Sequence, residues 1–200
     1  TGWETVVLAS CPQHKEYEGK SIAEAAEMKR MDPYELAFDL LLDSLSGEGG
    51  VTVLLYGMSE ENLHTILKHP ASMIGSDSWA LAPYGVLSKR RTHPRMYGCY
   101  PRILAKYVRE KKILTLEEAI RKMTSFPAQA LGLQDRGVLR EGMWADIVIF
   151  NPKTVTDRST LKEPNLYPQG IEYVLVNGEI VVEKGEHTGA LPGKVLRLSQ

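Results

Sequence analysis

The sequence is poor in cysteine, lacks any long hydrophobic run and has no excess of either charge. Its 200 residues include two cysteines, Cys11 and Cys99, which are too few for a disulfide framework, so a packed core has to stabilise the chain. No apolar run approaches the ~20 residues of a membrane helix, which predicts no membrane association. With 24 Lys and Arg against 25 Asp and Glu, the net charge of -1 argues against a nucleic-acid partner bound through bulk charge.

The motifs of several enzyme classes are also missing. The sequence contains no His-x-His, His-Glu-x-x-His or Cys-x-x-Cys, so it offers no self-sufficient metal site. It has no Gly-x-Ser-x-Gly nucleophile elbow, and the glycines of residues 47–50 precede an apolar run, whereas those of a dinucleotide fingerprint follow a strand. The two cysteines have no obvious base beside them, which indicates buried structural thiols. Their low number predicts a reduced, cytoplasmic setting.

Up to about residue 132, short apolar runs alternate with stretches of helical spacing. The runs at residues 5–9, 51–56 and 71–75 have the form of strands buried on both faces. Helices are expected over residues 22–31, from residue 33 to the glycines at 47–50, after residue 59, over 100–111 and over 115–125. This alternation predicts parallel β/α units.

Two local signals refine this picture. Ser21 with Glu24, and Thr115 with Glu118, have the spacing of capping boxes at helix starts. Residues 79–97 show no periodicity and are rich in Gly, Pro, His, Arg and Tyr, which predicts a long loop of the kind that often carries function.

After residue 132 the pattern changes to short apolar runs divided by turn residues. Strands are expected over residues 137–139, 145–150, 171–176 and 179–183. The dipeptide Asn177-Gly178 between the last two predicts a hairpin with a type I′ turn. We therefore expect two parts, a β/α part over residues 1–132 and an antiparallel β part over residues 133–200.

Asp77 and Arg95 are the candidate site residues. Asp77 follows the third expected strand, and β/α folds place their active sites at such strand ends, although an Asp there can also cap the next segment. Arg95 lies on the expected loop, where a guanidinium suits a substrate carboxylate and His93 would stiffen its approach. The alternative for Arg95 is a solvated basic loop.

Several segments, taken in order, carry a family resemblance. They include Ile74-Gly75-Ser76-Asp77, His93-Pro94-Arg95, Met123-Thr124 with Pro127-Ala128, and Gly142 with Ala145-Asp146-Ile147-Val148. In these segments the chain resembles the C-terminal part of the D-aminoacylase (N-acyl-D-amino-acid deacylase) family within the amidohydrolase superfamily. The resemblance extends over essentially the whole chain.

The resemblance implies an α/β fold: the last strands and helices of a (β/α)8 barrel over residues 1–132, followed by strands of a small β-sandwich domain over residues 133–200. It also implies zinc-dependent hydrolysis of N-acyl-D-amino acids, with most zinc ligands on earlier strands that this chain does not contain. Asp77 would pass a proton from the attacking water to the leaving amine, and is also considered as a metal ligand. Arg95, with His93, would bind the substrate carboxylate.

The expected partners are a small N-acyl amino acid, the missing N-terminal part of the barrel, and further copies of the chain. The preference for D over L substrates follows from the resemblance alone. The alternative is a non-catalytic association module that has lost the metal-binding half, and the isolated chain is expected to be inactive.

Overall fold

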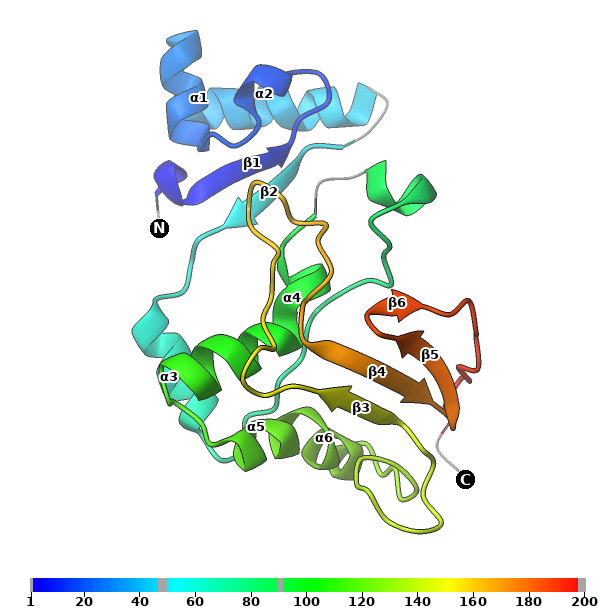
Figure 1. Cartoon of the computed structure of the whole chain (residues 1–200). Helices are drawn as coiled ribbons and strands as arrows, with labels where there is room; N and C mark the ends of the chain where they lie inside the picture. The colour runs from blue at the N-terminus through cyan, green and yellow to red at the C-terminus, as the bar shows by residue number, and fades with distance from the viewer. Residues whose placement is uncertain (1, 47–49, 90–91, 198–200) are drawn as a thin grey trace. The chain divides into compact units, whose positions relative to one another are not determined.

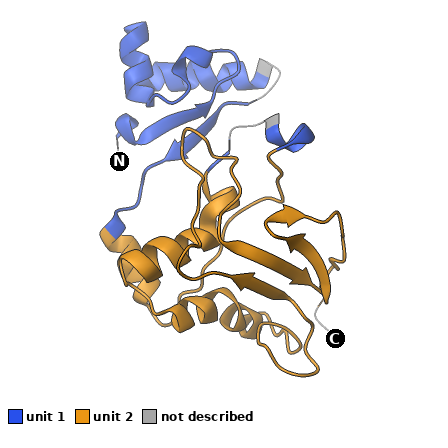
Figure 2. Ribbon diagram, viewed as in Figure 1, with its two compact units in different colours: residues 1–60, 84–93 blue, residues 61–83, 94–200 orange. Residues whose placement is uncertain are grey.

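The computed structural model describes residues 2–46, 50–89 and 92–197. The chain forms two compact units, which Figure 2 colours separately. Unit 1 comprises Thr1–Glu60 and Tyr84–His93, and unit 2 comprises Glu61–Pro83 and Pro94–Gln200. No helix in the described ranges is both long and apolar enough to span a bilayer.

Unit 1 pairs two strands and packs two helices with them (Figure 1). Its elements are β1 (Val6–Ser10), α1 (Ile22–Lys29), α2 (Pro33–Ser46) and β2 (Thr52–Leu55). The buried core consists of Leu8, Cys11, Tyr17, Ile22, Ala25, Ala26, Leu36 and Leu40. This cluster joins β1 to one face of both helices, which is how a unit of this size removes apolar surface from water.

The predicted caps and helix starts of this unit are confirmed. The Ser21 hydroxyl accepts a hydrogen bond from the Glu24 amide at 3.1 Å, and the Glu24 carboxylate accepts one from the Ser21 amide at 2.7 Å. At the start of α2 the Asp32 carboxylate accepts from the Tyr34 amide at 2.8 Å. The predicted end of this helix at residues 47–50 lies largely outside the described residues.

The prediction of parallel β/α units is wrong for the first two strands. β1 and β2 are antiparallel, with Val7 opposite Leu54 and Ser10 opposite Thr52. Two helices separate the strands, and the chain enters β2 beside the C-terminal end of β1 and runs back along it. The expected burial on both faces is also wrong for β2, in which Leu55 is 73% exposed. An apolar run therefore indicates a strand but determines neither its direction nor what covers it.

Unit 2 contains four α-helices, a π-helix and a sheet in the described residues. The helices are α3 (Glu60–Lys68), α4 (Arg95–Arg102), the π-helix Ile103–Glu110, α5 (Leu116–Met123) and α6 (Ser125–Ala130). Their shared core consists of Leu67, Ile103, Tyr107, Leu114 and Ala119. The Thr115 hydroxyl accepts from the Glu118 amide at 3.2 Å, as the cap at the start of α5 predicts.

The sheet of unit 2 is antiparallel with strand order β3-β4-β5-β6. Its strands are β3 (Ile147–Phe150), β4 (Ile171–Val176), β5 (Glu179–Glu183) and β6 (Glu186–His187). The predicted hairpin is confirmed, because Asn177 and Gly178 both have positive φ, 51° and 86°, as a type I′ turn requires. These strands form a single sheet, so they do not by themselves make a sandwich.

Two expected strands do not form. Residues 71–75 are irregular and have no partner strand among the described residues, and the Ile74 amide bonds instead to the Lys122 carbonyl of α5 at 3.1 Å. Residues 137–139 are irregular: Gly137 has φ +88°, and a Cβ there would lie 2.7 Å from the Ala128 side chain of α6. A strand needs a neighbour with matching donors and acceptors, which a short apolar run does not guarantee.

The expected boundary at residue 132 does not divide the chain into its compact units. Both sides of it belong to unit 2. Arg109 of the π-helix donates to the carbonyls of Pro152 and Val155, at 3.2 and 2.7 Å, and so links the helical part to the segment that follows β3. The change in hydrophobic pattern at residue 132 therefore marks a change of secondary structure inside one unit.

Candidate functional site

Asp77 lies on the irregular segment between α3 and the short 3-10 helix Gly85–Lys89, with an exposed side chain. It does not end a strand, which corrects the expectation from the sequence. Its backbone has φ 46°, a left-handed conformation that Asp tolerates better than most residues. Conformations of this kind recur at functional sites, where surrounding contacts hold them in place.

Arg95 is the first residue of α4, so the predicted loop ends three residues earlier than expected. Its Nη2 lies 2.6 Å from the Asp77 Oδ2, and its Nε donates to the Asp77 carbonyl oxygen at 3.1 Å. One guanidinium therefore holds both the side chain and the backbone of Asp77. The two residues selected from the sequence, 18 positions apart, are in direct contact.

The energy of this contact is small. The Asp77 side chain is 85% exposed and that of Arg95 is 41% exposed. An ion pair between such exposed groups contributes about 0.2–1 kcal/mol, since water competes for both partners. The contact therefore orients the carboxylate without contributing much to folding stability, and a ligand with its own carboxylate can displace it.

The first turns of α4 contact the Asp77 segment at two further points. The Ser78 hydroxyl lies 3.3 Å from the Met96 Sδ. The Cys99 thiol, one turn after Arg95, lies 3.7 Å from the Gly75 carbonyl oxygen. Burial raises the pKa of this thiol, against the opposing effect of two nearby arginines, so it stays protonated and can donate.

The prediction of buried structural thiols fits Cys11 fully and Cys99 in part, since Cys99 is half-buried. Sequence reasoning missed the role of Cys99 beside the candidate site. Its position four residues after Arg95, on the same face of the helix, is the signal that could have found it.

His93 is the last residue of unit 1 and precedes the start of α4 by two positions. Its side chain is half-buried. Its role in substrate binding stays a prediction.

No three His, Cys, Asp or Glu side chains come together to hold a metal ion in the described ranges. Structural and catalytic zinc sites use three or four such ligands. Asp77, the one metal ligand considered from the sequence, is bound to Arg95. The donors of the described residues therefore do not fit a zinc site within this chain.

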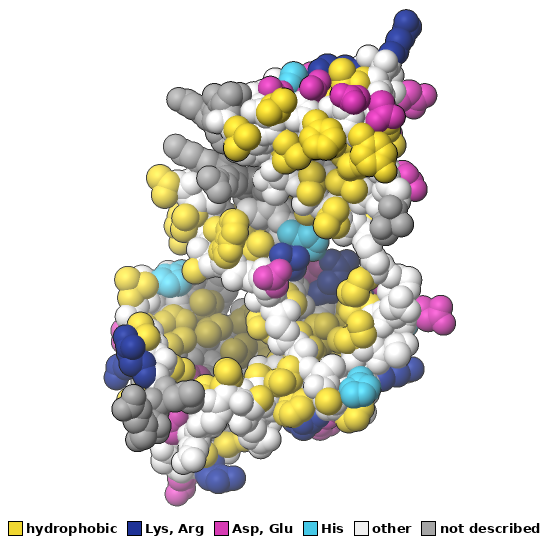
Figure 3. Space-filling view, turned by 180° about the vertical axis from the view of Figure 1, so that it is seen from behind, with side chains coloured by type: hydrophobic (Ala, Val, Ile, Leu, Met, Phe, Trp, Pro, Cys, Tyr) yellow, Lys and Arg dark blue, Asp and Glu magenta, His cyan; other side chains and the backbone are white. Residues whose placement is uncertain are grey.

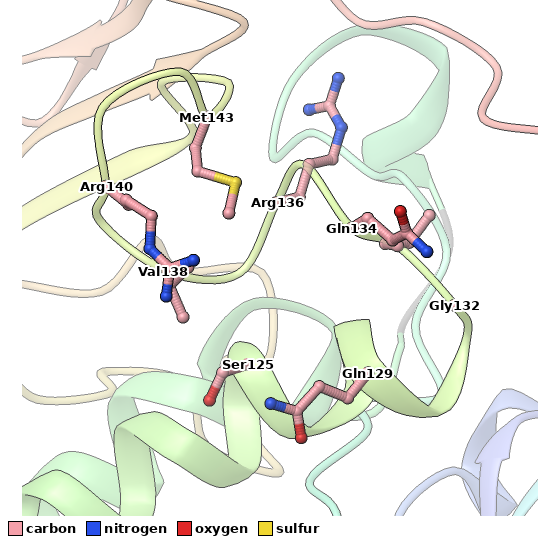
Figure 4. A pocket seen from close by; sticks show the side chains of 9 residues that line it. Ser125, Gln129, Gly132, Gln134, Arg136, Val138, Arg140 and Met143 are labelled. Atoms are coloured by element: carbon pink, nitrogen blue, oxygen red, sulfur yellow. The ribbon is translucent and has the colours of Figure 1, made fainter.

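A pocket of about 410 Å³ lies elsewhere in unit 2, between α6 and the loop that leads to β3 (Figure 4). Ser125 and Gln129 of α6 lie on one side, and Arg140 and Met143 of the loop lie across from them. Arg136 also lines it, but its guanidinium points away and binds Asp146 and Asn177. None of the candidate site residues lines this pocket, so concavity alone does not locate the site.

A family model described as "Amidohydrolase family" matches residues 5–182. The chain is 39% identical over 184 residues to the N-acyl-D-glutamate deacylase of Alcaligenes xylosoxydans xylosoxydans, covering 92% of the chain and 34% of that enzyme. It is 33% identical over 190 residues to the D-aminoacylase of the same organism, covering 95% of the chain and 36% of the relative.

A solved structure agrees with these matches. The N-acyl-D-glutamate deacylase of Bordetella bronchiseptica, in complex with zinc and a phosphonate inhibitor that mimics the tetrahedral intermediate, has a TM-score of 0.80 and 36% identity. The match covers 98% of this chain and 38% of that one. The chain thus spans about a third of the length of the relatives it matches. The resemblance found in the sequence is confirmed: the chain belongs to the amidohydrolase family.

Proposed function

We propose that the chain is the part of a metal-dependent deacylase that carries the proton-transferring carboxylate, and that the complete protein hydrolyses N-acyl-D-amino acids. The observation that carries this proposal is the contact between Asp77 and Arg95, which places an exposed acid beside a cation suited to bind a substrate carboxylate. The similarity to N-acyl-D-glutamate deacylase and D-aminoacylase supports the substrate class and the preference for D-amino acids.

Asp77 serves as the general base and then as the general acid. Its carboxylate takes a proton from the water that attacks the amide carbonyl carbon. When the carbon–nitrogen bond breaks, the same group gives that proton to the leaving nitrogen, so the products are a carboxylic acid and a free amino acid. In the free protein Arg95 holds the Asp77 side chain by an ion pair and the Asp77 backbone by a hydrogen bond, which orients the carboxylate for the first step.

Arg95 binds the free α-carboxylate of the substrate. A guanidinium has five donors, of which Asp77 engages Nε and one donor of Nη2. Because the exposed pair is weak, a substrate carboxylate can exchange with the Asp77 side chain while Nε keeps the backbone contact. The exchange would leave the Asp77 carboxylate facing water at the time when it has to accept a proton.

Zinc is proposed as the cofactor of the complete protein, with ligands from outside these 200 residues, since the donors of the described residues are too few. The related deacylase of B. bronchiseptica was solved with zinc. We also propose that the complete protein closes a (β/α)8 barrel that includes residues 1–132 and a β-sandwich that includes residues 133–200, and that it acts in the cytoplasm. The remaining part of the barrel is then the principal partner of this chain, with self-association as a further interaction.

The test uses the full-length protein, purified with its metal, and N-acetyl derivatives of D- and L-amino acids. We expect release of free D-amino acid. Asp77→Asn should lower kcat by about 10²–10⁴-fold, the usual contribution of a positioned proton-transfer group, while the melting temperature stays unchanged. Full activity of Asp77→Asn would overturn the role of Asp77 in proton transfer. Hydrolysis of neither enantiomer would overturn the proposed activity and favour the non-catalytic association module.

A second variant tests Arg95 with a control on the same helix. Arg95→Lys keeps the charge but loses the planar fork, so kcat/KM should fall by ~10–100-fold for an acyl amino acid. It should fall much less for the corresponding α-carboxamide, which offers no anion to bind. Arg102→Lys, which changes an arginine of α4 that pairs with Asp157 at 3.3 Å, should leave both substrates unaffected. Equal losses on both substrates would assign Arg95 to loop structure alone.

A further inference from the structure

Lys122 of α5 is the largest side chain that the described residues bury completely, with 0% exposure. Lysine is almost never fully buried without partners, because its ammonium loses its hydration. Burying such a group costs desolvation free energy, and apolar replacements of similar volume often stabilise a protein more. A contribution to folding stability therefore does not explain why this lysine is buried.

All three donors of this ammonium point to the chain segment that leads to Asp77. The Lys122 Nζ donates to the His69 carbonyl oxygen at 2.6 Å and to the carbonyl and hydroxyl oxygens of Ser72, both at 2.9 Å. Three donors meeting three acceptors is the full hydrogen-bonding capacity of an ammonium group. The Lys122 carbonyl oxygen also accepts from the Ile74 amide at 3.1 Å.

This segment has no helix or strand that could hold it otherwise. From the end of α3 at Lys68 to residue 84, the backbone forms turns, bends and irregular structure. Asp77 follows Ile74 by three residues, which at ~3.5 Å per residue keeps it within about 10 Å of the last contact with α5. The segment is thus fixed from α5 up to Ile74 and from α4 beyond it, with Asp77 in the second part.

Glu118 completes the arrangement on α5. Its carboxylate lies 3.7 Å from the Lys122 Nζ and accepts two hydrogen bonds from Arg121, at 2.8 and 2.9 Å. The Arg121 hydrogen bonds lower the pKa of Glu118, so it faces the lysine as an anion at neutral pH. At 3.7 Å this anion stabilises the buried ammonium without displacing the three oxygens that accept its hydrogen bonds.

We propose that Lys122 is a positioning residue for the deacylase reaction: its buried ammonium fixes the backbone of residues 69–74 and thereby the place of Asp77. Only the kinetic part of this inference, the effect on kcat, rests on the proposed function. The contacts of Lys122 with residues 69–74, which we call the Lys122 tether, lie within unit 2. Their effect on this segment can be measured without an activity assay.

The test compares Lys122→Met with Lys68→Met in the full-length, metal-loaded protein. Lys68, exposed at the end of α3, is one residue before the tethered segment and serves as the matched control. Hydrogen exchange of the amides of residues 73–78 should speed up by about tenfold or more in Lys122→Met, with little change elsewhere, and stay normal in Lys68→Met. In the same variant kcat should fall by about 10–100-fold while KM changes by less than about threefold.

Ser72→Ala provides a second, milder variant in case Lys122→Met does not fold. It removes one of the three acceptors, so exchange at residues 73–78 should rise less, and kcat should fall by only about threefold. In a protein that already carries Lys122→Met, Ser72→Ala should cause almost no further change in hydrogen exchange or kcat, because the ammonium that donates to Ser72 is absent.

The results distinguish a failure of this inference from a failure of the proposed function. If the full-length protein hydrolyses no acyl amino acid, the proposed function fails, and exchange alone decides whether the tether exists. If hydrogen exchange at residues 73–78 is unchanged in both Lys122→Met and Ser72→Ala, the inference that Lys122 fixes this segment is overturned. Faster exchange throughout unit 2 with kcat and KM unaltered would make Lys122 a general core residue and overturn its positioning role.

Discussion

The two units are stabilised by different kinds of contact. Unit 1 has an apolar core under α1 and α2, in which Leu8 and Leu36 are fully buried. Unit 2 has an apolar core as well, but charged side chains make many of its connections. Arg109 binds the carbonyls of Pro152 and Val155, Lys122 binds the segment before Asp77, and Arg136 joins Asp146 to the β4–β5 turn.

Both units expose large apolar side chains, and those of unit 1 include a stripe along one helix. Apolar side chains gather on the exposed surface of unit 1, as Figure 3 shows. On α2 the exposed ones recur at helical spacing: Tyr34, Phe38, Leu41, Leu42 and Leu45. In unit 2 the polar contacts concentrate on irregular segments, including the one that carries Asp77. We infer that apolar packing shapes unit 1, whereas directional contacts fix the segment of unit 2 that carries Asp77.

The largest effect should come from the core of unit 1. Leu36→Ala removes a fully buried side chain and leaves a cavity, which should lower the free energy of unfolding by about 3 kcal/mol. Leu41→Ala, on the exposed side of the same helix, should change it by less than about 0.5 kcal/mol. Chemical denaturation of the two variants measures the contrast, and similar losses for both would show that the exposed face is covered in the protein.

A smaller effect is expected from a charged connection in unit 2. Arg136→Met leaves Asp146 without its main partner, and because Asp146 is a third exposed we expect a loss of about 2 kcal/mol instead of the full cost of a buried unpaired charge. Arg140→Met, which changes an exposed arginine of the same loop, is the control. Hydrogen exchange should localise the Arg136→Met effect to β4 and β5. A loss confined to unit 1 would contradict the assignment.

The smallest effect compares one helix cap in each unit. Ser21→Ala removes the hydroxyl that accepts from the Glu24 amide and donates to the Glu24 carboxylate, while the backbone half of the capping box remains, and should cost about 1 kcal/mol. Thr115→Ala removes a single hydrogen bond to the Glu118 amide and should cost less, nearer ~0.5 kcal/mol. Thermal unfolding of both variants checks the order. A larger loss for Thr115→Ala would mean that α5 depends on its cap because it holds Lys122 in place.

Local features of the fold were predictable from the sequence. The caps at Ser21 and Thr115 and the hairpin turn at Asn177-Gly178 depend on residues within a few positions of one another, and all three are confirmed. The order of characteristic segments also identified the family, because a series of short motifs is a property of the chain itself. Asp77 and Arg95 were selected on residue type and context, and both lie in one contact.

The tertiary structure alone decided strand direction, strand pairing and the surroundings of the candidate site. The apolar run of residues 71–75 became an irregular segment held by Lys122, because no strand lies beside it in the described residues to complete a ladder. The direction of β2 depended on where the chain emerges from α2. The sequence thus determined the residue types that can do the chemistry and the local turns and caps, since these depend on near neighbours. Only long-range contacts, such as that of Lys122 with residues 50 positions away, decided where the Asp77 carboxylate lies.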